Sequence, residues 1–121
     1  MEIVHLPSSA SGAEIAEVLR RDGPVVVDEM VDPGLLDRFF DEMQPFVDAT
    51  PNGSDGFTGF TTRRTGGLLA RSATAQELVM HPSVTATCDD FLGHVTSYQL
   101  HLTQIIDIGP GGEAQPTHRD Q

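Results

Sequence analysis

The spacing of apolar residues predicts two helices in the first half of the chain. The first opens with a capping box at Ser11, carries a short apolar stripe around Ile15, and ends at the Asp-Gly-Pro sequence of residues 22–24. The second spans roughly residues 33–48, because Asp32 followed by proline is a typical helix start. Its apolar residues recur at helical spacing and predict a buried face: Leu36, Phe39, Phe40, Met43, Phe46 and Val47.

Shorter signals predict two further helices and one strand. Three consecutive valines at residues 25–27 predict a short buried strand. A second capping box, which begins at Thr74, predicts a helix that runs toward Met80. Pro82 is expected in the first turn of another helix, which ends near Leu92. Helices therefore dominate the chain before its β-rich region.

The β-rich region covers residues 95–108, and its side chains alternate between two faces. One face is mainly apolar and carries Tyr98, Leu100, Leu102, Gln104, Ile106 and Ile108. The opposite face carries Gln99, His101, Thr103, Ile105 and Asp107. A Gly-Pro-Gly-Gly sequence at residues 109–112 breaks the run and predicts a tight turn. The pattern predicts one long strand.

Residues 50–67 are rich in Gly, Thr, Asn and Asp, which predicts a loop with at most short strands. A loop of this length in a compact domain tends to be functional or disordered. Arginines gather in and after it, at Arg63, Arg64 and Arg71. Arginine binds carboxylates and phosphates through paired hydrogen bonds. Arg64 and Arg71 are therefore candidate substrate-binding residues, with solvated or structurally paired arginines as the alternative.

Length and charge limit the classes of function. The chain has 121 residues, enough for one domain with a core, and 38% of them are hydrophobic. It carries 18 acidic against 7 basic side chains, a net charge of −11. Nucleic acid is not an expected partner, because neutralising phosphates requires clustered Lys and Arg. The single cysteine, Cys88, excludes an intrachain disulfide. With neither a signal peptide nor a membrane span recognisable, we expect a cytoplasmic protein.

The tripeptide His118-Arg119-Asp120 carries the clearest chemistry in the chain. On an extended segment, side chains two residues apart point to the same face. Non-heme Fe(II) oxygenases use such a His and carboxylate pair as two arms of a 2-His-1-carboxylate triad. His118 and Asp120 are therefore candidate metal ligands. A solvated His and Asp pair at the start of a strand is the alternative interpretation.

Together these features resemble the phytanoyl-CoA dioxygenase family. The resemblance rests on the run from Tyr98 to Gly111 followed by the tripeptide at 118–120, and on the Asp-Gly-Pro-Val-Val-Val sequence at residues 22–27. Residues 57–72 also resemble a bacterial or fungal branch of that family. The resemblance implies an α+β fold, in which N-terminal helices pack on the first part of a double-stranded β-helix, or jelly roll. Residues 1–121 would then form the N-terminal portion of a single oxygenase domain.

The same resemblance implies a dioxygenase that uses Fe(II), 2-oxoglutarate and O2 to hydroxylate a small organic substrate. His118 and Asp120 match the first two metal ligands, and Gln104 matches a strand residue that contacts 2-oxoglutarate. A glutamine at a sheet surface is the alternative for Gln104, and Gln99, His101 and Thr103 are rivals on the other face. The family's second histidine and its 2-oxoglutarate-binding arginine lie later than Gln121, so we expect a jelly roll cut short and self-association through unpaired strands. A non-catalytic binding or assembly module of the same fold remains an alternative.

Overall fold

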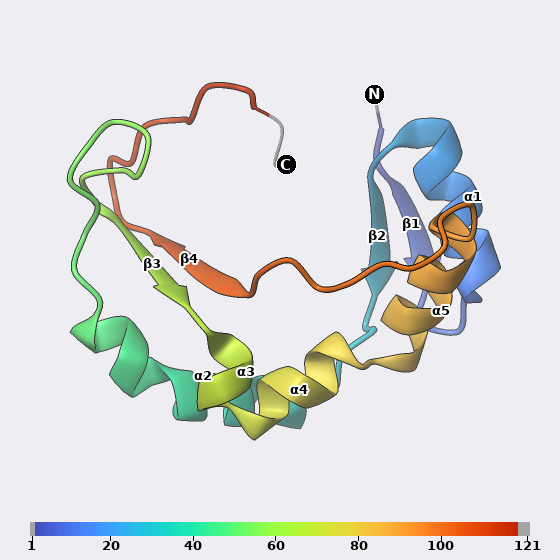
Figure 1. Ribbon diagram of the computed structural model, residues 1–121, viewed down its shortest axis with the longest axis horizontal. Coiled ribbons are helices and arrows are strands. Elements are labelled where there is room, and N and C mark those ends of the chain that lie inside the picture. Colours follow the sequence, from blue (N-terminus) through green and yellow to red (C-terminus); the bar gives the residue numbers. More distant parts are fainter. Residues whose placement is uncertain (1, 119–121) are drawn as a thin grey trace.

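The computed structural model describes residues 2–118, which form five helices and four short strands. In chain order they are β1 (Val4–Pro7), α1 (Gly12–Asp22), β2 (Val25–Asp28), α2 (Pro33–Ala49), β3 (Thr62–Gly66), α3 (Leu68–Arg71), α4 (Ala73–Val79), α5 (Pro82–Phe91) and β4 (Gln104–Ile108). Figure 1 shows α2, α3 and α4 along the base, with one two-stranded sheet on each side. The described residues thus form a mixed α and β structure; the complete jelly roll stays a prediction.

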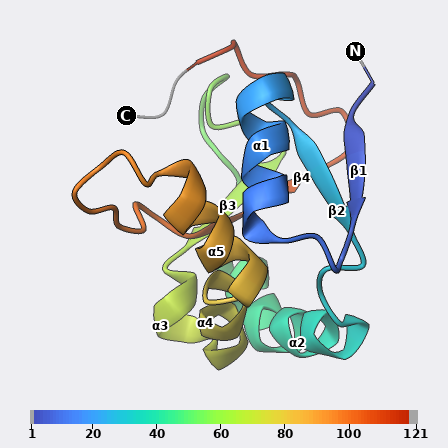
Figure 2. The same ribbon diagram turned by 90° about the vertical axis from the view of Figure 1, so that its right-hand side faces the viewer.

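One side of the molecule is built by α1, α5 and a parallel pair of strands. Strands β1 and β2 pair with Val4 opposite Val25. Helix α1 lies on this pair with α5 beside it, as Figure 2 shows. The capping box at Ser11 is confirmed. Gly12, at the start of α1, lies so close to α5 that a Cβ atom there would stand 2.5 Å from the carbonyl carbon of Ala86. Glycine therefore permits this helix contact.

The core lies where α2, α3 and α4 meet β4. Met43 of α2 is fully buried and packs with Leu68 and Ala75, and Ile105 of β4 packs against this cluster. Helix α2 begins at Asp32 as predicted, and its side-chain oxygen accepts a hydrogen bond from the amide of Leu35 at 3.1 Å. The core therefore fixes β4 against the helical base, and the sheet that β4 forms with β3 inherits this position.

Helix α4 begins two residues earlier than the sequence predicted. Its N-cap is Ser72, whose Oγ accepts a hydrogen bond from the amide of Ala75 at 2.8 Å. The hydroxyl of Thr74 instead donates to Glu42 Oε1 at 2.8 Å, and Ser72 Oγ donates to Glu42 Oε2 at 2.5 Å. The Thr74 capping box was therefore wrong, because that side chain is engaged by a carboxylate on α2.

The long strand predicted over residues 95–108 was wrong for most of its length, since β4 covers only Gln104–Ile108. Its antiparallel partner β3 has five residues, and pairing ends where Gly66 faces Gln104. Beyond that point Gly67 adopts a left-handed conformation (φ 69°) and the chain enters α3. Residues 98–103 consequently have no neighbouring strand in the described structure and form no regular ladder. Strand β1 was not predicted at all.

No helix within residues 2–118 is both long enough and apolar enough to cross a membrane.

Candidate functional site

A cavity of about 630 Å³ lies over the β3–β4 sheet and is lined by three of the six candidate site residues from the sequence. Its polar and aromatic lining comes from three separate parts of the chain: Phe57, Arg64, His101, Gln104, Gln115 and His118. Its apolar lining comes from Leu100, Leu102 and Ile106. A mixed lining of this kind, with a few convergent polar groups, is typical of sites for small molecules.

The register of the sheet decides which side chains reach the cavity. Arg64 of β3 pairs with Ile106 of β4, so both project from the same face. Gln104 lies two residues before Ile106 and therefore shares this face. Arg63 projects from the opposite face, where its guanidinium lies 3.8 Å from a carboxylate oxygen of Asp48 on α2. One of the two adjacent arginines thus lines the cavity and the other does not.

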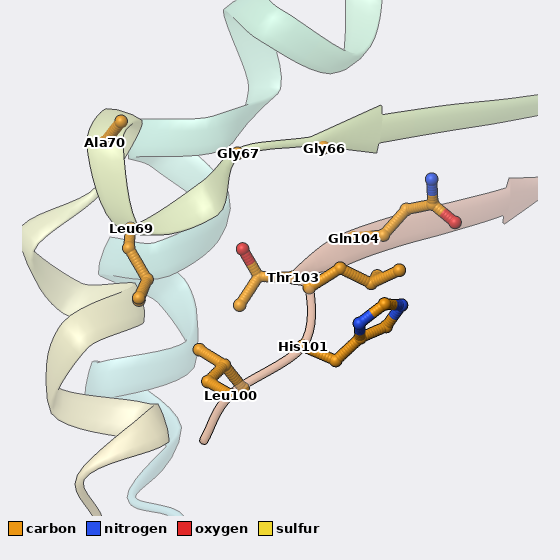
Figure 3. A pocket seen from close by; sticks show the side chains of 9 residues that line it. Gly66, Gly67, Leu69, Ala70, Leu100, His101, Thr103 and Gln104 are labelled. Atoms are coloured by element: carbon orange, nitrogen blue, oxygen red, sulfur yellow. The ribbon is translucent and has the colours of Figure 1, made fainter. Parts of the chain in front are cut away.

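The chain just before β4 is anchored to the start of α3. Thr103 accepts two hydrogen bonds there, from the amide of Gly67 to its carbonyl at 3.2 Å and from the amide of Leu68 to its Oγ1 at 3.0 Å. Figure 3 shows the Thr103 side chain on the side of α3, and the side chains of His101 and Gln104 together on the other side. Strict alternation predicted opposite faces for His101 and Gln104. They share a cavity because residues 101–103 are not a regular strand.

The loop before β3 is closed and ordered by its own hydrogen bonds. Its ends meet through an isolated bridge between Asn52 and Arg63 and a hydrogen bond from the amide of Gly53 to the carbonyl of Thr62 at 2.9 Å. Gly59 turns the chain toward β3 with φ at +84°, a conformation that favours glycine. Segments of this compact kind, with adjacent ends, are Ω-loops.

A hydrogen bond to this loop orients the side chain of Arg64. Its Nε donates a hydrogen bond to the carbonyl of Thr58 at 3.2 Å, and the side chain is half-buried. Within residues 2–118 no carboxylate lies within ion-pair distance of this guanidinium. The positive charge acts more weakly on Asp55, where it adds to the hydrogen bonds from Thr58 that lower the pKa of that carboxyl. The terminal nitrogens of Arg64 are therefore suited to bind an anion in the cavity.

His118 also lines the cavity and lies on the segment that follows β4. Its Nδ1 lies 2.9 Å from the carbonyl of Pro116, and its ring meets that of Phe57 edge-on at 5.3 Å and 63°. A carbonyl only accepts hydrogen bonds, so Nδ1 is the donor in this contact. Gln115 joins the same two segments, because its Nε2 donates to the carbonyl of Phe57 at 2.6 Å. Figure 1 shows this segment passing over the loop before β3.

The remaining candidates from the sequence lie elsewhere. Gln99 lines a separate cavity of about 500 Å³, formed mainly by apolar side chains of α4 and α5. Arg71 lies over the ring of Phe46 at 4.9 Å, a cation–π contact outside the 630 Å³ cavity. Asp120 lies outside the described residues. Of the six candidates, the structure thus brings together Arg64, Gln104 and His118.

Sequence reasoning missed three residues that shape this cavity. The ring of Phe57 contacts His118, and Gln115 donates a hydrogen bond to the carbonyl of Phe57. The carboxylate of Asp55 accepts a hydrogen bond from the amide of Phe57 and so organises the loop that carries it. An Asp followed by glycine and then aromatic and hydroxyl residues is a turn signal that identifies the Asp55 side chain. No local signal identifies Gln115, because its contact joins residues 58 positions apart.

The donors present are compatible with a metal, although residues 2–118 contain no group of three or more His, Cys, Asp or Glu side chains that could hold one. Histidines that ligate metals usually donate their other ring N–H to a carbonyl or carboxylate. The contact between His118 Nδ1 and Pro116 provides this arrangement, so Nε2 would be the ring nitrogen that binds a metal. Asp120 would supply the carboxylate oxygen.

Comparison with known proteins gives consistent matches. The sequence profile of the phytanoyl-CoA dioxygenase (PhyH) family matches residues 19–121. Dioxygenase FrzG of Cladobotryum sp. is 33% identical over 96% of this chain and 43% of its own length, and dioxygenase aneA of Aspergillus aculeatus is 33% identical over 89% of this chain and 39% of its own length. Multifunctional dioxygenase ausE of Penicillium brasilianum is 28% identical over 95% of the chain and 40% of its own length. The chain therefore spans about two-fifths of these relatives.

Proposed function

Because this chain belongs to the phytanoyl-CoA dioxygenase family, we propose that its 630 Å³ cavity is part of an oxygenase site that uses Fe(II) and 2-oxoglutarate to hydroxylate a small organic molecule. The names of relatives support the reaction class, since the three relatives described above are all called dioxygenases. In such a site Fe(II) would bind and activate O2, which is the oxidant, while 2-oxoglutarate would give up two electrons on decarboxylation to succinate and CO2 and the C–H bond of the substrate would give up the other two. The residues of this chain bind and orient the reacting groups.

The single observation that carries the proposal is the convergence of Arg64, Gln104 and His118 on one cavity. They lie on β3, on β4 and on the segment after β4, so only the fold brings them together. His118 offers a ring nitrogen for the metal, and Asp120 is its proposed partner ligand. Imidazole and carboxylate are the two ligand types of non-heme Fe(II) oxygenases.

The proposed cosubstrate is a dicarboxylate, and the cavity offers two groups for it. We assign to one of its carboxylates the guanidinium of Arg64, a substrate-binding candidate in the sequence analysis, because it can form paired hydrogen bonds with a carboxylate. The amide of Gln104 can donate to a second oxygen. Leu100, Leu102 and Ile106 supply apolar surface for the carbon skeleton of the substrate. We propose no nucleic acid or membrane partner, since the chain carries a net charge of −11.

The proposal is tested by binding Fe(II) and 2-oxoglutarate to the chain without oxygen. An Fe(II)–2-oxoglutarate chelate has a visible charge-transfer absorption, which reports both ligands at once. We expect weak binding that gives this absorption in the wild-type chain and loses it in His118→Ala. His94→Ala is the matched control, because His94 is exposed and lies outside the cavity. Absorption that survives His118→Ala would place the metal elsewhere and refute the proposal.

A second function, a non-catalytic assembly module of the same fold, is favoured by the apolar surface that the chain exposes. Leu102, which lies just before β4, and Ile106 and Ile108 of β4 are 59%, 50% and 63% exposed, which is unusual for large apolar residues so close together. Under this alternative the surface would bind another protein chain. Binding of Fe(II) and 2-oxoglutarate separates the two proposals, because an assembly module requires neither.

A further inference from the structure

We propose that Asp55 is a positioning residue, which holds the loop before β3 in the shape that places both Arg64 and His118 in the lining of the cavity. The part of this inference that concerns ligand affinity rests on the function proposed above. The part that concerns side-chain position rests on the geometry alone. Asp55 itself does not line the 630 Å³ cavity, so it acts through other residues.

One carboxylate oxygen of Asp55 organises the turn that follows it. Oδ1 accepts hydrogen bonds from the amide of Phe57 at 2.9 Å, from the amide of Thr58 at 2.7 Å and from the hydroxyl of Thr58 at 2.8 Å. The carbonyl of Asp55 also accepts from the amide of Gly59 at 2.8 Å. Four hydrogen bonds to one residue fix the backbone across the turn, because each satisfied donor restricts the loop conformation.

The electrostatics of the turn agree with an ionised Asp55. Backbone and side-chain hydrogen bonds from Thr58 lower the pKa of the carboxyl below its ordinary value, and Arg64 adds a smaller effect in the same direction. An ionised carboxylate accepts hydrogen bonds more strongly than a neutral group does. The turn is therefore held by charge-assisted bonds at neutral pH, although Asp55 is exposed.

Two paths lead from this turn to the cavity. Through Thr58, the turn presents a carbonyl to Nε of Arg64 at 3.2 Å and so orients the guanidinium. Through Phe57, the turn presents a ring to His118 and a carbonyl to Gln115. Residues 57 and 58 are the same two residues whose amides Asp55 binds. Loss of these bonds would therefore allow the side chains of both Arg64 and His118 to move from their positions in the cavity.

Three variants separate a positioning role from a merely structural one. Asp55→Ala removes the acceptor oxygen, while Asp55→Asn keeps an oxygen at the same place without its charge. Asp37→Ala is the matched control, because Asp37 is an exposed carboxylate on α2, away from the loop. Circular dichroism checks that each variant keeps its helices, most of which lie outside this loop.

The first readout is the NMR spectrum of the His118 ring, assigned with His118→Ala. The Phe57 ring lies 5.3 Å away and shifts the His118 proton resonances by its ring current. Phe57→Leu removes that current and gives the size of the full effect. We expect Asp55→Ala to move the His118 resonances most of the way to their positions in Phe57→Leu, and Asp55→Asn to leave them near wild type. Unmoved resonances in a folded Asp55→Ala chain would refute the positioning role.

The second readout is affinity for 2-oxoglutarate in the presence of Fe(II) under anaerobic conditions. We expect Asp55→Ala to raise Kd by roughly tenfold, as the loss of orientation at Arg64 implies, and Asp55→Asn by about twofold or less. Equal losses of affinity in Asp55→Ala and Asp55→Asn would also refute the inference, because asparagine keeps the acceptor oxygen through which Asp55 is proposed to hold the turn. If wild type binds no 2-oxoglutarate while the His118 resonances still move, the proposed function fails and the positioning role stands.

Discussion

Replacing Arg64 by alanine is the sharpest perturbation of the proposed site, because an adjacent arginine provides the control. Arg64 projects into the cavity beside Gln104, whereas Arg63 projects from the other face toward Asp48. The two variants remove the same side chain and the same charge from neighbouring positions of β3. Any difference between them therefore reports the position of the guanidinium and not the net charge of the chain.

The expected magnitude follows from the bonds that Arg64 can offer. Its Nε already donates to Thr58, which leaves the terminal nitrogens for a bound carboxylate. A hydrogen bond to a charged group contributes about 1.5–3 kcal/mol. Arg64 is only half-buried, so solvent screens its interaction with a carboxylate. The two hydrogen bonds from its terminal nitrogens should therefore contribute together about 1.4–2.8 kcal/mol to binding. This corresponds to an increase in Kd of roughly 10- to 100-fold for Arg64→Ala.

The assay is isothermal titration of 2-oxoglutarate into the chain with Fe(II), without oxygen. Arg63→Ala should change Kd by about twofold or less, since the charge at that position is screened by solvent. Arg64→Lys should fall between wild type and Arg64→Ala, because lysine keeps the charge but lacks the planar fork. Equal effects of Arg63→Ala and Arg64→Ala would refute the reasoning, since they would show that only overall charge attracts the anion.

Three further predictions concern stability and association. Met43→Ala should lower the free energy of unfolding by about 2–5 kcal/mol in urea denaturation, because Met43 is fully buried in the core. The pKa of Glu42 is lowered chiefly by the hydroxyl of Ser72 and then by Thr74, so its stabilisation is present above its ordinary pKa of 4.5 and is lost as pH falls through the lower folded value. The stability difference between wild type and Glu42→Gln should accordingly shrink in acid, and a constant difference would contradict this. Ile108→Lys should reduce self-association in sedimentation velocity, because Ile108 is 63% exposed beside an open strand edge.

Local signals in the sequence predicted four helices, but not α3, and the predicted buried face of α2 was wrong at three positions: Leu36, Phe40 and Phe46 are 37%, 54% and 37% exposed. The capping residues Ser11 and Asp32 and the proline at Pro82 begin helices in the structure as expected. These signals succeed because a helix end is determined by hydrogen bonds within a few residues. The Thr74 capping box failed for the opposite reason: its hydroxyl is bound by Glu42, 32 residues earlier, and no local pattern contains that contact.

Strand lengths and pairings were predicted less well, because a strand depends on its partner. Val4–Pro7 is a strand only through its parallel pairing with Val25–Asp28, and its four residues carry no pattern of their own. Residues 95–103 alternate as a strand should, yet β3 is too short to pair with them. Side-chain alternation therefore indicates what a segment is able to form, while the length of the neighbouring strand determines what forms.

The choice between Arg63 and Arg64 shows most directly where sequence reasoning ends and why. Both residues have the same chemistry and the same neighbours in the chain, and a shift of one residue in strand register would exchange their faces. The register is fixed by Ile105, which packs against the core and thereby turns Ile106, and with it Arg64, toward the cavity. The polarity of the two side chains does not decide which arginine lines the cavity. The contact of an apolar residue of the neighbouring strand with the core selects which guanidinium lines the cavity, so the candidate site is specified by the core beneath it.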